Sequence, residues 1–284
     1  MLKFLPPFVI EKLKNFPLNA ITEIRIRAGI PIKAIINRDG KIATETLGVS
    51  MGAEDIERAM MKLSNYTLFS VEESLKRGFI TSGEGERVGV CGECVTSLKA
   101  VSAVKNVTSL CVRFPHDVIG CAEKFFREKL RGEAKSCLII SPPFQGKTTF
   151  IRDLGRTVSD KLGLNVLFID ERDELGGGGR FYLGENADVM RYASKSYAFA
   201  VGIRNLHPDV IVCDELMDEE DCKAAEFAAL SGVKVIATVH AASVGDVIKK
   251  ENFKRAAENS VFDVYAELKN FNVKKVYDGR FNEI

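Results

Sequence analysis

The segment from residue 137 to residue 152, CLIISPPFQGKTTFIR, constrains the fold of this chain more than any other stretch. It begins with apolar residues typical of a buried strand, passes through a short loop, and continues in residues typical of a helix that starts at Lys147. Gly146 suits the end of the loop because glycine adopts backbone angles that other residues avoid. The pattern therefore predicts a strand, a tight loop and a helix whose unpaired N–H groups face the edge of a sheet.

The loop matches the phosphate-binding pattern G-x-x-x-x-G-K-[ST], except that Ser141 stands in place of the first glycine. A helix amino end of this kind binds phosphate oxygens through its N–H groups and its dipole. We expect Lys147 to reach the β- and γ-phosphates of a nucleotide and the Thr148 hydroxyl to hold Mg²⁺. The alternative is a strand–turn–helix with a chance Gly-Lys-Thr. The predicted nucleotide-binding residues are Ser141, Pro142, Pro143, Phe144, Gln145, Gly146, Lys147, Thr148 and Thr149.

Length and composition indicate an ordinary globular protein of one or two domains, with 284 residues and 46% hydrophobic residues. The net charge of +1 provides no overall basic field, so we expect no nucleic-acid partner. Seven thinly spread cysteines fit reduced thiols better than a secreted disulfide framework. No apolar run approaches the roughly 20 residues of a membrane-spanning helix. We therefore expect a soluble, cytoplasmic protein.

The first part of the chain reads as a mixture of strands and helices. Residues 21–27, ITEIRIR, alternate, which predicts a strand with Ile21 on the charged face and Ile24 and Ile26 on the other. A second strand follows at 31–37, and Asp39-Gly40 predicts a hairpin turn. Helices are also expected in 2–16 and, as two helices split near Asn65, in 53–77. Strands are expected on both sides of a glycine-rich turn in GFITSGEGERVGVCGECV and at 108–114.

The second part alternates strands with helices, after a bridging helix expected between 116 and 131. Its strands are continuous apolar runs, which is typical of parallel strands covered on both faces. This pattern predicts an α/β fold with a mostly parallel sheet. Strands are expected at 137–140, 165–170, 209–214, 234–240 and, at an edge, near 261–267 and 273–277; helices are expected at 147–162, 194–206 and 219–230.

Several polar residues follow the carboxyl ends of these strands, where ligands bind in such sheets. Asp214 and Glu215 follow the apolar strand DVIVCD and look like a Walker B pair, in which Asp214 holds Mg²⁺ and Glu215 polarises the attacking water. Glu171 follows NVLFID and can position that water; a helix cap or a surface ion pair is the alternative. His240 ends the strand KVIATVH and can contact the γ-phosphate, although a lone histidine there is often structural.

Cys91 and Cys94 have metal-ligand spacing, C-x-x-C, in the middle of the chain. A structural zinc site needs four ligands, and neither a second C-x-x-C nor paired histidines follow. We therefore predict buried or inert thiols rather than a metal site.

Together these segments resemble one family. The segments are ITEIRIRAGIPIK, GFITSGEGERVGVCGE, LCVRF, SPPFQGKTTFIRDLGR, FIDERDELGG, IRNLHPDVIVCDEL and GVKVIATVHA. They resemble the secretion-type traffic ATPases, the hexameric motors of type II and type IV secretion, and within them the stage III sporulation protein AA family. The resemblance covers nearly the whole chain, and it includes the Ser-Pro-Pro opening of the loop.

The resemblance implies a RecA-like P-loop NTPase domain over residues 119–284, preceded by a smaller α+β domain over residues 1–118. It implies an ATPase that uses ATP and Mg²⁺ and forms a homo-oligomer, a hexamer with ATP at the subunit interfaces. The N-terminal domain would pack on a neighbouring subunit and close over the nucleotide. The expected partners are membrane-embedded channel proteins of endospore formation, which a cytoplasmic protein meets at the inner face of a membrane.

The resemblance also implies roles for particular residues. Thr148 and Asp214 would bind the metal, and Glu215, Glu171 and His240 would be catalytic. Such rings often add arginines from a neighbouring subunit, and the candidates are Arg25, Arg27, Arg87, Arg113 and Arg204.

Two alternatives stay open. One is a nucleic-acid-dependent RecA-like ATPase, which the balanced charge argues against. The other is a non-catalytic ring subunit that binds nucleotide as a structural clamp, which the bulky Phe144 and Gln145 would favour.

Overall fold

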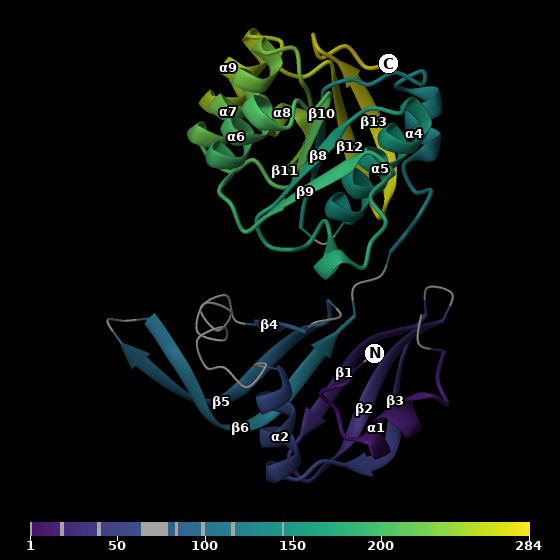
Figure 1. Cartoon of the computed structure of the whole chain (residues 1–284). Helices are drawn as coiled ribbons and strands as arrows, with labels where there is room; N and C mark the ends of the chain where they lie inside the picture. Colours follow the sequence, from purple (N-terminus) through teal and green to yellow (C-terminus); the bar gives the residue numbers. More distant parts are fainter. Residues whose placement is uncertain are drawn as a thin grey trace. The chain divides into compact units, whose positions relative to one another are not determined.

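The structure is a computed structural model that describes residues 2–17, 20–38, 41–63, 79–82, 85–97, 100–114, 117–143 and 145–284 (Figure 1). The chain divides into two compact units. The first unit is Met1–His116 together with Gly177–Arg180, and the second is Asp117–Gly176 together with Phe181–Ile284. The first unit thus includes a short segment from the second half of the chain, which the division predicted from sequence did not anticipate.

The first unit is built on a six-stranded antiparallel sheet in the order β3-β2-β1-β6-β5-β4. The strands are β1 (Ile21–Arg27), β2 (Ile30–Arg38), β3 (Lys41–Ser50), β4 (Phe79–Thr81), β5 (Arg87–Ser97) and β6 (Ala100–Arg113). The helices α1 (Pro7–Leu13) and α2 (Ala53–Leu63) pack their buried residues into the same core as β1 and β2. The α+β character predicted for this part of the chain matches these elements.

The alternation predicted for β1 is interrupted at its start. Ile21 is fully buried together with Ile24 and Ile26, whereas the sequence placed it on the charged face. The reason is a register shift against β2 between Ile21 and Glu23, which acts as a β-bulge and moves Ile21 into the core. The prediction for Ile21 was therefore wrong by one residue of register.

Two sequence predictions in the first unit fall on residues outside the described ranges. The turn residues Asp39 and Gly40 are not described, although Arg38 and Lys41 pair across β2 and β3 on either side of them. The first of the two helices predicted in 53–77 is α2, and the second lies outside the described residues.

The second unit contains a seven-stranded sheet in the order β13-β12-β7-β11-β10-β8-β9. The strands are β7 (Cys137–Ser141), β8 (Val166–Asp170), β9 (Ala187–Arg191), β10 (Val210–Cys213), β11 (Lys234–His240), β12 (Val264–Lys269) and β13 (Asn272–Asp278). All neighbours are parallel except β12 and β13, which form an antiparallel hairpin at one edge. The predicted mostly parallel α/β fold is confirmed.

Helices cover both faces of this sheet (Figure 1). On one face lie α4 (Glu123–Glu128) and α5 (Lys147–Leu162), and on the other lie α6 (Lys195–Asn205), α7 (Glu219–Leu230), α8 (Val244–Ile248) and α9 (Glu251–Glu258). Successive strand residues alternate between the two cores: Leu138 and Ile140 pack on the α6 side, and Cys137 and Ile139 on the α5 side. Burial on both faces explains the continuous apolar runs in the sequence.

Some elements differ from the sequence-based expectation. The bridging helix is limited to α4, because the Asp153 carboxylate accepts the N–H groups of Gly120 and Ala122 and holds the preceding chain outside a helix. The edge strand β9 and the helices α8 and α9 were not predicted; β9 is partly exposed along its length, so it lacks a continuous apolar run. Within the described residues, no helix combines the length and apolarity that a bilayer span requires.

Gly155 is a point where α5 lies close against the sheet. A Cβ at this position would lie 2.7 Å from Phe168 Cζ and 2.8 Å from Val212 Cγ2. We predict that Gly155→Ala lowers the free energy of unfolding by about 1 kcal/mol, since overpacking of about 1–3 kcal/mol outweighs the helix propensity of alanine. Urea denaturation measures this change.

The control is Gly245→Ala in α8, where the nearest atom to the new Cβ is Ser243 Oγ at 3.6 Å. This variant should be neutral or more stable by up to about 1 kcal/mol. Equal stability of the two variants would contradict the close packing at Gly155.

Candidate active site

The predicted phosphate loop joins β7 to α5. Gly146 has φ 90° and ψ 20°, in the left-handed region that glycine favours, and it caps α5 without a side-chain hydrogen bond. A glycine cap has no side chain that could occupy the first N–H groups of the helix, which suits phosphate binding. Pro142 and Pro143 are exposed, and Phe144 lies outside the described residues.

Lys147 lies almost buried beneath this loop. Its Nζ donates to the carbonyl oxygens of Ser141 and Pro142, each at 2.9 Å, and lies 2.9 Å from His240 Nδ1. Burial lowers the pKa of Lys147, and the nearby Asp214 and Glu215 oppose that shift. An ammonium group can only donate, so His240 Nδ1 accepts and the imidazole proton sits on Nε2. That Nε2 faces Glu215 Oε1 at 3.2 Å.

Asp214 is held from two sides by hydroxyl groups. Thr148 Oγ1 donates to one carboxylate oxygen and Thr238 Oγ1 to the other. Thr238 also accepts the backbone N–H of Glu215 at 2.8 Å, so one buried threonine orients both acidic residues. A threonine hydroxyl beside a carboxylate is an oxygen donor set suited to Mg²⁺. These residues therefore fit the metal predicted for this position.

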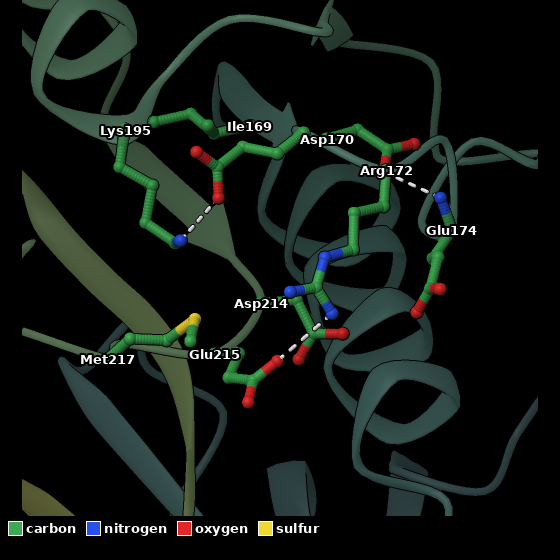
Figure 2. A pocket seen from close by; sticks show the side chains of 9 residues that line it. Ile169, Asp170, Arg172, Glu174, Lys195, Asp214, Glu215 and Met217 are labelled. Carbon is green, nitrogen blue, oxygen red and sulfur yellow. Dashed lines mark hydrogen bonds and ion pairs between the residues drawn. The ribbon is translucent and has the colours of Figure 1, made fainter. Parts of the chain in front are cut away.

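Glu215 has φ 48°, a backbone conformation that is strained for a residue with a side chain. The strained turn directs its carboxylate between His240 and Arg172, whose Nη1 lies 3.4 Å from Glu215 Oε2. Figure 2 shows Arg172 reaching across a pocket toward Glu215, with Asp214 beside it. Strain of this kind often marks functional sites.

Glu171 also lines this pocket, and so does Lys195, which Figure 2 labels. The side chain of Lys195 is only 5% exposed and forms ion pairs with Glu171 and, at 3.4 Å, with Asp221. Asp170 turns inward instead, and its carboxylate accepts the N–H groups of Glu174 and Gly176. Burial raises the pKa of Asp170 against the effect of these donors.

The structure thus brings together most of the predicted site. Lys147, Thr148, Asp214, Glu215 and His240 form one connected set, which Ser141 joins through its carbonyl. Glu171 lies in the adjoining pocket, and Thr149 follows Thr148 in the first turn of α5.

Three contributors were missed from the sequence: Thr238 as an orienting group, Arg172 and Lys195. The only signal for Thr238 was a polar residue inside an apolar strand. The sequence marks Arg172 only as the neighbour of Glu171 and gives no role to Lys195.

Four of the candidate arginines lie on neighbouring strands of the first unit. Arg113 of β6 is paired with Glu23 of β1 on one side and with Arg87 of β5 on the other. Arg25 and Arg27 follow Glu23 along β1. The Glu23 carboxylate pairs with Arg25 and with Arg113, at 3.4 Å for the latter. Arg204 is different because it lies near the end of α6, which leads to the amino end of β10. The phosphate loop follows the carboxyl end of β7, at the other end of the parallel strands.

The C-x-x-C cysteines were predicted to be buried or inert. Cys91 and Cys94 are both exposed free thiols on β5. The thiols are therefore not buried, and their inertness stays a prediction. Within the described ranges, no group of three or more potential ligands from His, Cys, Asp and Glu gathers around a point that could hold a metal.

The sheet order and the loop at the end of β7 define the class, a RecA-like P-loop NTPase fold. Two solved structures share this fold. The pilus retraction motor PilT with bound ADP gives a TM-score of 0.63 at 17% identity, covering 92% of this chain and 76% of PilT. The ATPase DotB of Legionella pneumophila gives a TM-score of 0.59 at 16% identity, and the match covers 99% of this chain and 79% of DotB. The chain thus shares its fold with the pilus retraction motor PilT and the ATPase DotB.

The sequence comparisons identify the family within this class. The family model for sporulation stage III, protein AA matches residues 9–283. Stage III sporulation protein AA of Bacillus subtilis (strain 168) is 33% identical over 270 residues, which cover 91% of this chain and 87% of the relative. The chain belongs to the stage III sporulation protein AA family, which confirms the resemblance seen in the sequence.

We predict that Lys195→Met lowers the free energy of unfolding by about 2 kcal/mol, because it leaves Glu171 and Asp221 without their cation. The partial exposure of Glu171 keeps the loss below that of a fully buried pair. Burial lowers the pKa of Lys195, but Glu171 and Asp221 outweigh it and raise the pKa overall. This stabilisation is therefore complete below the ordinary lysine pKa of about 10.4 and is lost as pH rises through the folded-state pKa.

Urea denaturation of the wild type and of Lys195→Met at about pH 8 and about pH 11 tests this prediction. The difference in free energy of unfolding between the two proteins should be smaller at the higher pH. The control is Lys223→Met, which removes an exposed pair with Glu219 and should lower the free energy of unfolding far less than Lys195→Met does. Equal effects of the two substitutions would show that Lys195 does not hold the two carboxylates.

Proposed function

We propose that this protein is an ATP-hydrolysing motor of the secretion-ATPase type. The single observation that carries the proposal is the connected set formed by Lys147, Thr148, Asp214, Glu215 and His240 at the carboxyl edge of the parallel sheet. Membership of the family and the fold shared with PilT and DotB support it.

In this proposal each residue has a defined task. The N–H groups after Gly146 and the Lys147 ammonium bind the phosphates of ATP. Thr148 and Asp214 hold Mg²⁺, which when bound neutralises charge on the phosphates. Glu215 orients the attacking water and accepts its proton, and the hydrogen bond from Thr238 to Asp214 keeps the two acidic residues in register. His240 contacts both Lys147 and Glu215, so it can link the occupancy of the phosphate site to the base.

We further propose that the active form is a homo-oligomeric ring, a hexamer by analogy with secretion motors. The residues 1–118 and 119–284 would act as separate domains of each subunit, and arginines among Arg25, Arg27, Arg87 and Arg113 would act on the nucleotide of a neighbouring subunit. Closure on ATP and opening after hydrolysis would drive a membrane-embedded channel of endospore formation from its cytoplasmic side. The name of the Bacillus subtilis relative supports the role in sporulation.

Glu215→Gln tests the assignment of the base. The variant should bind Mg-ATP with wild-type affinity, because the amide keeps the size of the side chain and the proposed phosphate and metal ligands, Lys147, Thr148 and Asp214, are unchanged. Its hydrolysis rate should fall by roughly 10²-fold or more. Steady-state phosphate release measures the rate, and light scattering on the same samples shows whether wild-type activity rises as a ring assembles. Hydrolysis by the variant at the wild-type rate would mean that Glu215 is not the base.

Lys147→Ala tests the assignment of the phosphate site. It should weaken Mg-ATP binding by roughly ten-fold or more, because a buried charge-assisted contact is lost. Calorimetric titration measures the affinity, and Lys249→Ala, at an exposed lysine that pairs with Asp246, serves as the control. If the wild type binds Mg-ATP tightly yet shows no single-turnover hydrolysis, the protein is a nucleotide clamp and the proposal of a motor fails.

A further inference from the structure

The turn between β12 and β13 lies against the phosphate loop. Because β12 runs parallel to β7 and next to it, its end reaches the same edge of the sheet as the loop. Lys269 pairs with Asn272, so only Asn270 and Phe271 form the turn. β13 is the outermost strand on this side, which leaves the turn open to solvent.

Two hydrogen bonds fasten this turn to the loop residue Gln145. The N–H of Phe271 donates to the Gln145 carbonyl at 3.0 Å, and the N–H of Asn270 donates to the Gln145 side-chain carbonyl oxygen at 3.0 Å. The bulky Gln145, unusual for a phosphate loop, therefore has a structural partner. The ring of Phe271 lies over Gly146, where an added Cβ would overlap it.

Phe271 is a poor residue for this turn on backbone grounds. Asn270 has φ 49° and Phe271 has φ 61°, the geometry of a turn that strongly favours Asn-Gly. A bulky residue with positive φ is strained, and burial does not compensate for it here, since Phe271 is 45% exposed. Strain retained beside a ligand site points to a function for the side chain.

We propose that Phe271 is the stacking surface for the nucleobase of the bound nucleotide, an inference that rests on the proposed function. If the loop and the first turn of α5 bind the phosphates, the sugar and base of the nucleotide lie at the same end of the sheet as the Phe271 ring. One part of the ring is packed on Gly146, and the rest offers an exposed apolar face. A purine stacks on such a face without base-specific hydrogen bonds. The site therefore favours nucleotides over bare polyphosphates and discriminates little between ATP and GTP.

Phe271→Gly is the informative variant. It creates an Asn-Gly turn, which this backbone favours, and it keeps both hydrogen bonds to Gln145, so the fold and the loop are retained. Affinities of the full chain for Mg-ATP, Mg-GTP and Mg-tripolyphosphate are measured by calorimetric titration. We expect the variant to bind ATP and GTP roughly ten-fold more weakly and tripolyphosphate as well as the wild type does. The control is Phe227→Ala on α7, at a phenylalanine of similar exposure, 44%.

Three results would overturn the inference. The first is unchanged ATP affinity in Phe271→Gly. The second is an equal loss for ATP and tripolyphosphate, which would mean that the ring only holds the loop in place. The third is a wild-type protein that binds tripolyphosphate as tightly as ATP. A wild type that binds none of the three ligands would instead overturn the proposed function, and this inference with it.

Discussion

The hydrogen bonds that hold Asp214 are the constraint on which the site depends. Thr148 comes from the first turn of α5, Thr238 from β11, and Asp214 from the end of β10. The Asp214 carboxylate thus joins α5 to the neighbouring strands β10 and β11. Because the Thr238 hydroxyl also accepts the N–H of Glu215, any movement of α5 relative to the sheet is transmitted to the proposed base. In the proposed function, nucleotide binding and hydrolysis would therefore be coupled by short, direct contacts.

A second series of polar contacts shares Glu215 with the hydrogen bonds around Asp214. Lys147, His240, Glu215 and Arg172 follow one another at hydrogen-bond or ion-pair distance. Arg172 and Glu171 both come from the loop after β8, and Glu171 is held by the buried Lys195. The carboxyl ends of β8, β10 and β11 and the phosphate loop are thereby linked through polar side chains. Such a network can respond as a unit when the contacts of one member change.

The edge hairpin adds a third component from the far end of the chain. Its turn residues Asn270 and Phe271 are bonded to Gln145, about which the sequence suggested only that it is large for its position. The proposed nucleotide site would thus combine a phosphate-binding part on α5 with an apolar surface on the turn between β12 and β13. This division of labour is common, because phosphates need charge and N–H groups whereas bases need flat apolar surfaces.

Much of the second unit was determined by the sequence alone. The bounds predicted for α5, α7 and β11 match the structure, because continuous apolar runs, helix caps and the Gly-Lys-Thr loop act within a few residues. The proposed positions of Asp214, Glu215 and His240 followed from the rule that parallel strands end at one edge.

Only the tertiary structure decided the rest. The bulge that buries Ile21, the carboxylate partners of Lys195, and the docking of Phe271 on Gly146 each join residues that are distant in sequence or in different strands. Local patterns carry no information about such pairs, since register and side-chain contacts arise only when the strands and helices pack together.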